Sequence, residues 1–306
     1  ACMFTMMNEA RLFVGVQGVA IGERAYQGAL TFANERVQGA VPGGEKNAPI
    51  IGHPDVRRML MDMKASLMGA RTIALATAHA SDLAWAAADE GARKTAHARE
   101  ALLTPIAKAY GSDIGVWASS VGVQIHGGMG FVEETGAAQH YRDSRIAPIY
   151  EGTNGIQAID LIGRKLRRDG GQAMAAMIAD LEDILALARA AHEDGLSDFS
   201  CSVSNLDAGI NALKTATDIV RKAEETDALA SADAYLNLCG DVIAGGLLIR
   251  SVVNGLRAGD ADAPAMKKLV WHHAISRLSK APAWLPQIEQ GAGPVFGFPE
   301  ARLADL

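Results

Sequence analysis

The chain has 306 residues, of which 49% are hydrophobic, 21% are charged and 5% are aromatic. This balance is typical of a folded protein with one large domain or two smaller ones. The net charge is −6 and no basic stripe with interleaved aromatic residues is found, so nucleic-acid binding is disfavoured. Three widely spaced cysteines indicate reduced thiols and a cytoplasmic location. No stretch of about 18 apolar residues is free of charge, so no membrane-spanning helix is expected.

Abundant alanine and only 10 prolines predict an almost all-helical protein, because alanine has the highest helix propensity. Apolar residues recur at helical spacing from Phe4 to Val37, and the glycines inside this pattern are interpreted as points of close helix–helix contact. A turn-rich loop follows, and Pro54 then opens a second long helix. The predicted long helices span about 3–38, 54–89, 95–110 and 112–126, and their connections indicate an antiparallel four-helix bundle.

Shorter helices are predicted after this bundle, over about 134–142 and 154–166. Gly170 and Gly171 then mark a domain boundary, so the bundle is expected to occupy residues 1–168 and an additional helical extension residues 169–306. The helices predicted in the extension span about 172–194, 204–229, 231–257 and 263–280, before a tail along the surface. Because the helical pattern is already under way at residue 3, we expect the chain to be part of a longer protein.

One acidic residue stands out as a group that could carry chemistry. Glu151 follows the apolar residues 146–150 and precedes Gly152. A carboxylate in apolar surroundings can remove a weakly acidic C–H proton, and a glycine directly after it permits a tight turn and a close approach by a ligand. Thr153 and Asn154 can cap the helix that follows, whose N-terminus suits an anion.

The pattern Arg142-Asp143-x5-Ile149-Tyr150-Glu151-Gly152-Thr153-x3-Gln157 resembles the active-site signature of the acyl-CoA dehydrogenases. In that family the glutamate removes the α-proton of an acyl-CoA thioester, and the β-hydrogen leaves as a hydride to N5 of FAD. The thioester carbonyl is held by the N–H of the base and by a ribityl hydroxyl of the flavin. The resemblance implies that Glu151 is the catalytic base and that Gly152 and Thr153 contact the flavin.

Two further segments carry the same resemblance. Gln124-x3-Gly128 is similar to the family's flavin-adenine contact, and the segment ending in Arg36-Val37-Gln38-Gly39 is similar to its flavin-pyrophosphate contact. Cofactor roles are thereby implied for Gln124, Gly128, Arg36 and Gln38, in both cases across a dimer interface. An arginine suits this place because a guanidinium pairs with phosphate through two hydrogen bonds. The usual aromatic residue after this segment is absent, and Gly39 opens a longer loop, as in the larger members of the family.

The segment Met7–Arg11 resembles the first-helix segment that approaches the CoA moiety, which implies substrate contacts for Asn8 and Arg11. The resemblance covers residues 3–166, and residues 171–306 resemble the helical extension of the large members. The family's N-terminal helical domain and its middle β-domain, which holds the isoalloxazine ring, are absent from this chain. We therefore do not expect the chain by itself to turn over substrate.

Three hypotheses for the function follow. The favoured one is the C-terminal part of an FAD-dependent acyl-CoA dehydrogenase, a homodimer or dimer of dimers that passes electrons to an electron-transfer flavoprotein. An acyl-CoA oxidase of the same fold would use the same base but reoxidise the flavin with O₂. A non-catalytic helical interaction module would explain the alanine-rich bundle, but not the joint presence of Arg36, Gln124, Gly128 and the Glu151 segment. No metal site is expected, since a di-iron bundle needs paired Glu-x-x-His motifs.

Overall fold

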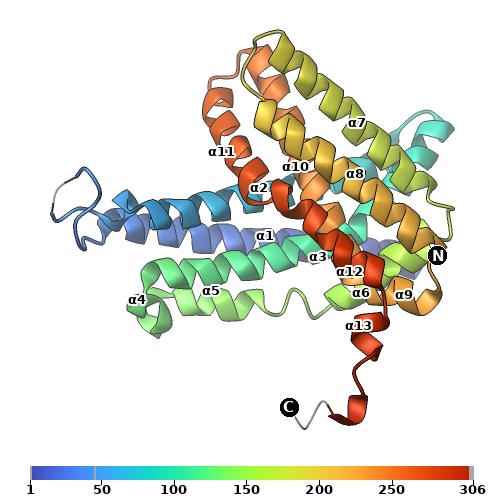
Figure 1. Cartoon of the computed structure of the whole chain (residues 1–306), viewed down its shortest axis with the longest axis horizontal. Coiled ribbons are helices and arrows are strands. Elements are labelled where there is room, and N and C mark those ends of the chain that lie inside the picture. Colours follow the sequence, from blue (N-terminus) through green and yellow to red (C-terminus); the bar gives the residue numbers. More distant parts are fainter. Residues whose placement is uncertain (1, 45, 303–306) are drawn as a thin grey trace.

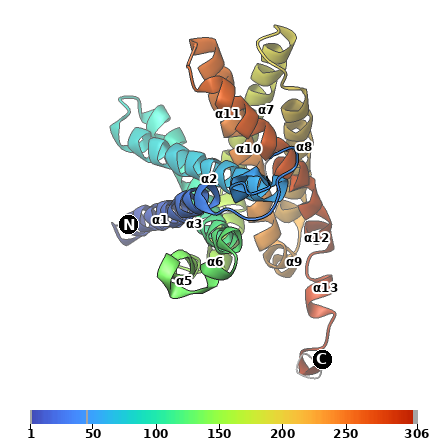
Figure 2. The same cartoon turned by 90° about the vertical axis from the view of Figure 1, so that its left-hand side faces the viewer.

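The computed structural model describes residues 2–44 and 46–302, and leaves aside the side chains of residues 2–5 and 301. Every regular element in these residues is a helix, and the one β-type pairing among them is an isolated antiparallel bridge between Val37 and Pro49. The predicted all-α fold class is confirmed. Figure 1 shows one group of helices lying along the long axis and a second group standing across it, and Figure 2 shows the first group nearly end-on.

The first group is built on three long helices, α1 (Cys2–Glu35), α2 (Pro54–Ala86) and α3 (Glu90–His126), with the short η1 (Ile50–Gly52) before α2. Pro54 occupies the first turn of α2, where the N–H that proline lacks would have no helical partner. Asp89 caps α3 by accepting a hydrogen bond from the N–H of Ala92 at 2.7 Å. Helix α2 runs back alongside the directly packed α1–α3 pair, so the three helices alternate in direction along the chain (Figure 1).

Glycines allow α1 and α3 to approach each other backbone to backbone. A Cβ on Gly15 would lie 2.4 Å from the carbonyl oxygen of Ala107, and one on Gly18 would lie 2.5 Å from the Cα of Ser112. No atom lies within 4 Å of a Cβ built on Gly28. The interpretation of these glycines as helix–helix contacts is therefore confirmed at Gly15 and Gly18 and wrong at Gly28.

The predicted break between a third and a fourth helix near Gly111 is wrong. Helix α3 runs unbroken for 37 residues and passes through Pro105 as well as Gly111. A Cβ on Gly111 would lie 2.8 Å from the carbonyl oxygen of Gly15, so this glycine makes room for α1 rather than ending a helix. Gly127 does end α3, with a positive φ of 59°, as predicted.

The fourth position of the bundle is shared by short elements: α4 (Gly128–Phe131), η2 (Glu133–Thr135), α5 (Ala137–Ser144), α6 (Asn154–Asp160) and η3 (Leu161–Leu166), the last a π-helical continuation of α6. Helix α5 packs on α1 and α3, and α6 packs on α3. Their direction is opposite to that of α1, since Tyr150 contacts Gln17 whereas Asp160 contacts Arg11. The antiparallel bundle is thus confirmed, with a fourth member that is interrupted around Glu151.

The extension is also helical, and its elements are α7 (Gln172–Glu193), α8 (Ser200–Lys222), α9 (Glu225–Ala230), α10 (Ala232–Ala258), α11 (Ala263–Ser276), η4 (Leu278–Trp284), α12 (Leu285–Gln290), α13 (Gly293–Phe296) and η5 (Glu300–Arg302). The helix predicted over 204–229 is divided into α8 and α9, because Ala223 adopts an extended backbone with ψ of 152°. Helix α10 is central: it packs on α2 as well as on α7, α8 and α11. One contiguous apolar core therefore joins both groups of helices, and the division at residue 168 stays a prediction.

Helix α10 is the one described helix that is long and apolar enough to cross a membrane, with a mean hydropathy of 1.5 in its most apolar window. The sequence expectation had not singled it out. In the structure 83% of that window is buried inside the protein, and the buried face includes Asp241. Its hydrophobicity is accounted for by its place at the centre of the core.

Candidate functional site

Glu151 lies in a tight turn between α5 and α6. Its φ is 55°, and it is the only non-glycine residue with positive φ among the described residues. A left-handed conformation costs a residue with a Cβ about 1–2 kcal/mol. Gly152 continues the turn with φ of 83°, and the N–H of Asn154 closes it by donating to the carbonyl oxygen of Pro148 at 3.0 Å. The strained backbone presents the exposed Glu151 side chain outward.

The side chain of Gln157 is hydrogen-bonded to the backbone of this turn. Its side chain is fully buried, and its Nε2 donates to the carbonyl oxygens of Glu151 at 3.3 Å and of Gly152 at 3.2 Å. A Cβ on Gly152 would lie 2.9 Å from that nitrogen, so both the conformation and the space require glycine. The sequence pattern contained Gln157 but gave no reason for it. The structure shows that it fixes the carbonyl groups of Glu151 and Gly152.

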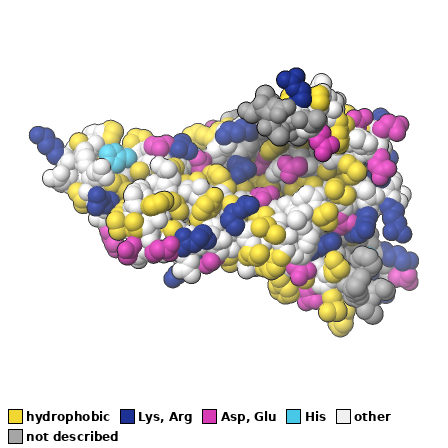
Figure 3. All heavy atoms as spheres, turned by 90° about the horizontal axis from the view of Figure 1, so that it is seen from below, with side chains coloured by type: hydrophobic (Ala, Val, Ile, Leu, Met, Phe, Trp, Pro, Cys, Tyr) yellow, Lys and Arg dark blue, Asp and Glu magenta, His cyan; other side chains and the backbone are white. Residues whose placement is uncertain are grey.

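The expected apolar surroundings of Glu151 are not formed within this chain. Ile146 and Ile149 are 46% and 52% exposed, and only Ala147 of the preceding apolar run is fully buried. Tyr150 turns inward and donates its hydroxyl to the side-chain oxygen of Gln17 on α1. Figure 3 shows the face on the side of α5 and α6, where exposed hydrophobic side chains lie among charged ones. Any apolar enclosure of the carboxylate must come from outside the described residues.

One of the two predicted caps of α6, Thr153, is confirmed. Thr153 is the N-cap, and its hydroxyl accepts from the N–H of Ile156 at 3.3 Å. Asn154 does not cap the helix: its amide side chain turns away and bonds to α3. Helix α6 has seven residues and passes directly into the π-helical η3.

A second group of predicted cofactor residues meets at the far end of α1 and α3. Arg36, Gln38 and Gly128 line a pocket of about 270 Å³ with His126. Gln124 is exposed one turn before the end of α3 and lies outside that lining, with its carbonyl oxygen accepting the capping N–H of Gly127.

His126 is fixed in this pocket wall. Its Nδ1 lies 2.7 Å from the carbonyl oxygen of Gly122 and therefore donates to it, and its ring stacks on Phe32 at 4.5 Å. The ring of His126 is therefore held in place by contacts within this chain. A Cβ on either Gly127 or Gly128 would meet no atom within 4 Å, so the backbone here is open to a ligand.

The long loop that Gly39 opens is tied back to the end of α1. The N–H of Ile50 donates to the carbonyl oxygen of Arg36 at 2.8 Å, and that of Gln38 to Ala48 at 3.3 Å. The Nε2 of His53 donates to the carbonyl oxygen of Gln38 at 3.0 Å. These bonds fix the backbone of Arg36 and Gln38 while both side chains stay exposed.

The two groups of predicted residues are well separated. With about 1.5 Å of rise per residue, the stretch from Gln17, beside Tyr150, to Arg36 is about 28 Å long. Figure 1 accordingly shows α4 and α6 at different places along the α1–α3 pair. The chain therefore does not gather its predicted flavin contacts at one point.

The predicted substrate residues do lie together. Asn8 and Arg11 line a pocket of about 700 Å³ that also contains Asp160 and the exposed Trp85. The other lining residues with charge are Glu100, Arg164, Lys165 and Arg168, so basic groups outnumber acidic ones. Arg11 is more buried than the sequence suggested, because its Nη1 donates to Asp160 Oδ2 at 3.2 Å.

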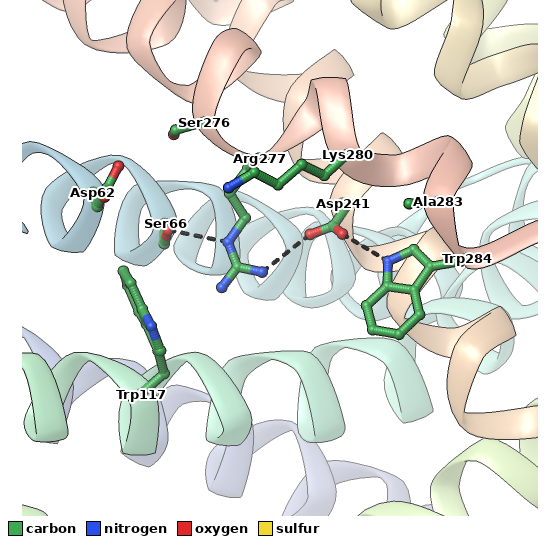
Figure 4. A pocket seen from close by; sticks show the side chains of 9 residues that line it. All are labelled: Asp62, Ser66, Trp117, Asp241, Ser276, Arg277, Lys280, Ala283 and Trp284. Carbon is green, nitrogen blue, oxygen red and sulfur yellow. Dashed lines mark hydrogen bonds and ion pairs between the residues drawn. The ribbon is translucent and has the colours of Figure 1, made fainter.

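A further cleft of about 340 Å³ lies where the extension meets the bundle, and none of the predicted site residues lines it (Figure 4). Arg277 from the extension points into it, donating from Nε to the hydroxyl of Ser66 at 3.3 Å and from Nη1 to Asp241 at 3.4 Å. Its guanidinium lies 5.4 Å from the ring centre of Trp117. These contacts join α2 and α3 to α10 and η4, so we interpret them as a structural junction.

No group of three or more His, Cys, Asp or Glu side chains that could hold a metal is found in residues 2–44 and 46–302.

Comparison with known proteins gives a match over the bundle. A family model described as "Acyl-CoA dehydrogenase, C-terminal domain" matches residues 1–166. Over 194 residues the chain is 54% identical to 3-methylmercaptopropionyl-CoA dehydrogenase of Ruegeria pomeroyi. The aligned region makes up 62% of this chain and 33% of that protein. Over 191 residues the chain is 37% identical to the broad-specificity linear acyl-CoA dehydrogenase FadE5 of Mycobacterium tuberculosis, covering 60% and 31%. The chain spans about a third of the length of these relatives.

Solved structures resemble nearly the whole chain, extension included. The Caenorhabditis elegans ACDH-11 structure in complex with C11-CoA has a TM-score of 0.75 at 20% identity, over 95% of this chain and 47% of that one. An acyl-CoA dehydrogenase from Bacillus anthracis complexed with FAD has a TM-score of 0.71 at 20% identity, over 94% and 49%. At 20% identity, this likeness establishes the fold of the extension and nothing about its role.

Proposed function

We propose, because this chain belongs to the acyl-CoA dehydrogenase family, that it forms the C-terminal part of a flavin-dependent enzyme that introduces an α,β double bond into an acyl-CoA thioester. One observation carries the proposal: an exposed carboxylate, Glu151, sits on a left-handed turn that Gln157 clamps from below. A fold rarely keeps such strain at a non-glycine residue unless the position has a use.

Glu151 acts as the base in this proposal. Its carboxylate takes the α-proton, and the electron pair of that C–H bond forms the double bond as the β-hydrogen leaves with its electrons. When bound, FAD supplies the acceptor for that hydride. The N–H of Glu151 has no acceptor among the described residues, so it can donate to the thioester carbonyl and stabilise the negative charge that develops there.

The residues present fit a flavin in two parts. Gly152 and Thr153 flank the base and would contact the reactive end. Arg36, Gln38 and Gly128 line a pocket whose backbone is open, and an exposed guanidinium beside it suits a phosphate. Gln124 lies next to this pocket and would complete the adenine side.

The separation of these two parts supports a dimer. A stretch of α1 about 28 Å long lies between them, so we assign them to two different flavins, one held chiefly by this chain and one by its partner. The active assembly would then be a homodimer or a dimer of dimers. We also propose an electron-transfer flavoprotein as electron acceptor and a cytoplasmic location.

For the substrate, we propose that Asn8 and Arg11 face the CoA moiety. Support comes from the pocket that they line, in which four basic side chains meet two acidic ones, a balance that suits phosphate groups. The relatives named above include one named for a methylmercaptopropionyl thioester and one for linear acyl groups. Both classes of thioester therefore belong in the first substrate panel.

The test uses the longer protein of which this chain is part, purified with its flavin. Anaerobic addition of acyl-CoAs should bleach the flavin absorbance, and Glu151→Gln should keep the flavin while slowing the bleaching by at least 10³-fold, on the order expected for loss of a catalytic base. Glu134→Gln, at an exposed carboxylate outside the turn, is the matched control.

Near-normal reduction of the flavin in Glu151→Gln would exclude Glu151 as the base. A flavin that no thioester bleaches would favour the non-catalytic helical module instead. Rapid reoxidation of the bleached enzyme on admitting air would identify an acyl-CoA oxidase rather than a dehydrogenase.

A further inference from the structure

Asn154 anchors the Glu151 turn to α3 through every polar atom of its side chain. Its Nδ2 donates to Ser112 Oγ at 2.9 Å, to Asp113 Oδ1 at 2.8 Å and to the carbonyl oxygen of Ala109 at 3.2 Å. Its Oδ1 accepts from Nζ of Lys108 at 2.8 Å. The turn is therefore fixed to one side of α3 only three residues after the proposed base.

Lys108 is an unusual anchor because it is a completely buried lysine. Its ammonium bonds to a neutral amide rather than directly to a carboxylate. Burial lowers the pKa of Lys108 to about 8, while the carboxylate of Asp113 raises it, the guanidinium of Arg11 lowers it and the carboxylate of Glu151 raises it.

A purely structural role does not call for this residue. Burying an ammonium is costly, and an apolar side chain would fill the same space between α1 and α3 without that cost. What an apolar side chain cannot do is donate a hydrogen bond to Asn154.

We propose that Lys108 is a positioning residue for the reaction: it holds the Glu151 turn on α3 through its hydrogen bond to Asn154, and with it the proposed base. The proposal rests on the proposed function of Glu151 as the base. Neither Lys108 nor Asn154 is required to touch the substrate.

The charges around Lys108 come from each element that faces it. Asp113 lies on the same helix, Arg11 lies on α1 and is paired with Asp160, and Glu151 lies on the turn. Two more charged residues act on Asp113: Asp233 raises the pKa of Asp113, and Arg145 lowers it. None of these charged groups is hydrogen-bonded to Nζ of Lys108, whose side-chain partner among the described residues is Asn154.

Removal of this hydrogen bond has a defined consequence. Without it Asn154 loses one of its anchors, and the Glu151 turn is held less firmly on α3. The limiting rate of flavin reduction should therefore fall about tenfold in Lys108→Met, with little change in the acyl-CoA concentration at half-saturation. Lys108→Arg keeps a hydrogen-bond donor and should restore most of the rate.

The experiment is anaerobic stopped-flow reduction of the holoenzyme by increasing concentrations of its best acyl-CoA, with Lys94→Met as the matched control at an exposed lysine. A limiting rate that is lowered in Lys108→Met, restored in Lys108→Arg and unchanged in Lys94→Met supports the proposal. A limiting rate of Lys108→Met equal to that of the unmodified enzyme overturns it. So does an equal fall in Lys108→Arg, which would mean that packing and not the hydrogen bond to Asn154 matters.

If Lys108→Met does not fold, Asn154→Ser provides the second test, because it shortens the tether while leaving Lys108 in place. We expect a fall of about tenfold in the limiting reduction rate with little change in the acyl-CoA concentration at half-saturation, as for a misplaced base. An unchanged limiting rate would overturn the tethering role. Glu151→Gln separates the two levels. If that variant is still reduced normally, the proposed function itself fails, whereas an inactive Glu151→Gln with an unaltered limiting rate in Lys108→Met defeats only this inference.

Discussion

Arg11 donates from Nη1 to Oδ2 of Asp160 at 3.2 Å, and both side chains are at least nine-tenths buried. This pair joins the beginning of α1 to the end of α6 and leaves the Nε of Arg11 and the Oδ1 of Asp160 without hydrogen-bond partners. Removing one member would leave the other as a buried charge without a counter-ion. Asp160→Leu should therefore lower the free energy of unfolding by about 3 kcal/mol in urea titrations. Asp183→Leu, at an exposed aspartate, is the control, and a loss below about 1 kcal/mol for Asp160→Leu would contradict the assignment.

The backbone contact between α1 and α3 makes a prediction about two glycines of one helix. Gly18→Ala places a Cβ 2.5 Å from the Cα of Ser112, where only backbone can give way, and should destabilise the chain by about 2–3 kcal/mol. Gly28→Ala meets no atom within 4 Å and should stabilise it by about 0.5–1 kcal/mol, since alanine is the better helix former. Thermal unfolding of both variants measures the contrast. Equal effects would mean that the helices are not in contact at Gly18.

His273 predicts how stability depends on pH. Burial, then the charges of Arg277 and His272, lower the pKa of His273 to about 3, and its Nε2 has no hydrogen-bond partner. Below its unfolded pKa of about 6.5 the unfolded chain gains a proton that the folded chain refuses, so stability is lost as the pH falls from about 6.5 towards 3. The slope should approach about 1.4 kcal/mol per pH unit. His273→Leu should remove this loss between pH 6.5 and 5 in urea titrations, whereas His79→Leu, at an exposed histidine, should not. An unchanged slope in His273→Leu would refute the prediction.

The junction between extension and bundle can be tested by a double-mutant cycle. Asp241 is buried and accepts from Tyr110 at 2.9 Å, from Trp284 at 3.1 Å and from Arg277 at 3.4 Å. Arg277→Met should cost about 3 kcal/mol because it leaves a buried carboxylate without its cation, and much less when Asp241→Asn is already present. A coupling energy of about 1–3 kcal/mol is expected from the free energies of unfolding.

The exposed pair formed by Arg189 and Asp207 provides the comparison for that cycle. Its two charges are largely screened by water, so its coupling energy should stay below about 1 kcal/mol. A coupling at the Asp241 junction no larger than this would mean that the junction contributes little to holding the two groups of helices together.

Much of the fold followed from helical periodicity, because long amphipathic or alanine-rich segments have few alternatives. The limits of α1, α2, α7 and α10 agree with the predictions to within a few residues. The error at Gly111 has a physical cause: a glycine inside a helix reads as a break when nothing in the sequence says that another backbone lies against it. The contact partner, Gly15, is far away along the chain.

The candidate site was predicted in part. The Glu151 turn and the Thr153 cap were predictable from local chemistry, and the cofactor roles of Arg36 and Gln124 stay predictions that rest on the resemblance. Lys108 was missed, although one lysine in the otherwise apolar run Pro105–Tyr110 was a usable signal. The clamp made by Gln157 could not be foreseen, because the positive φ that exposes the carbonyls to it is a property of the folded turn.

The contact between α1 and α3 has a consequence for the lengths that this protein tolerates. Because the two backbones touch at Gly15 and Gly18, α1 cannot slide or rotate locally to absorb an extra residue. One residue inserted between Gly18 and Arg36 would turn everything beyond it by about 100° and push it about 1.5 Å further, so that Arg36 would leave its pocket while Tyr150 stayed in place. In this part of the chain, insertions and deletions should therefore be confined to the loop between Gly39 and Pro49. The distance between the Glu151 turn and the pocket at Arg36 should stay constant.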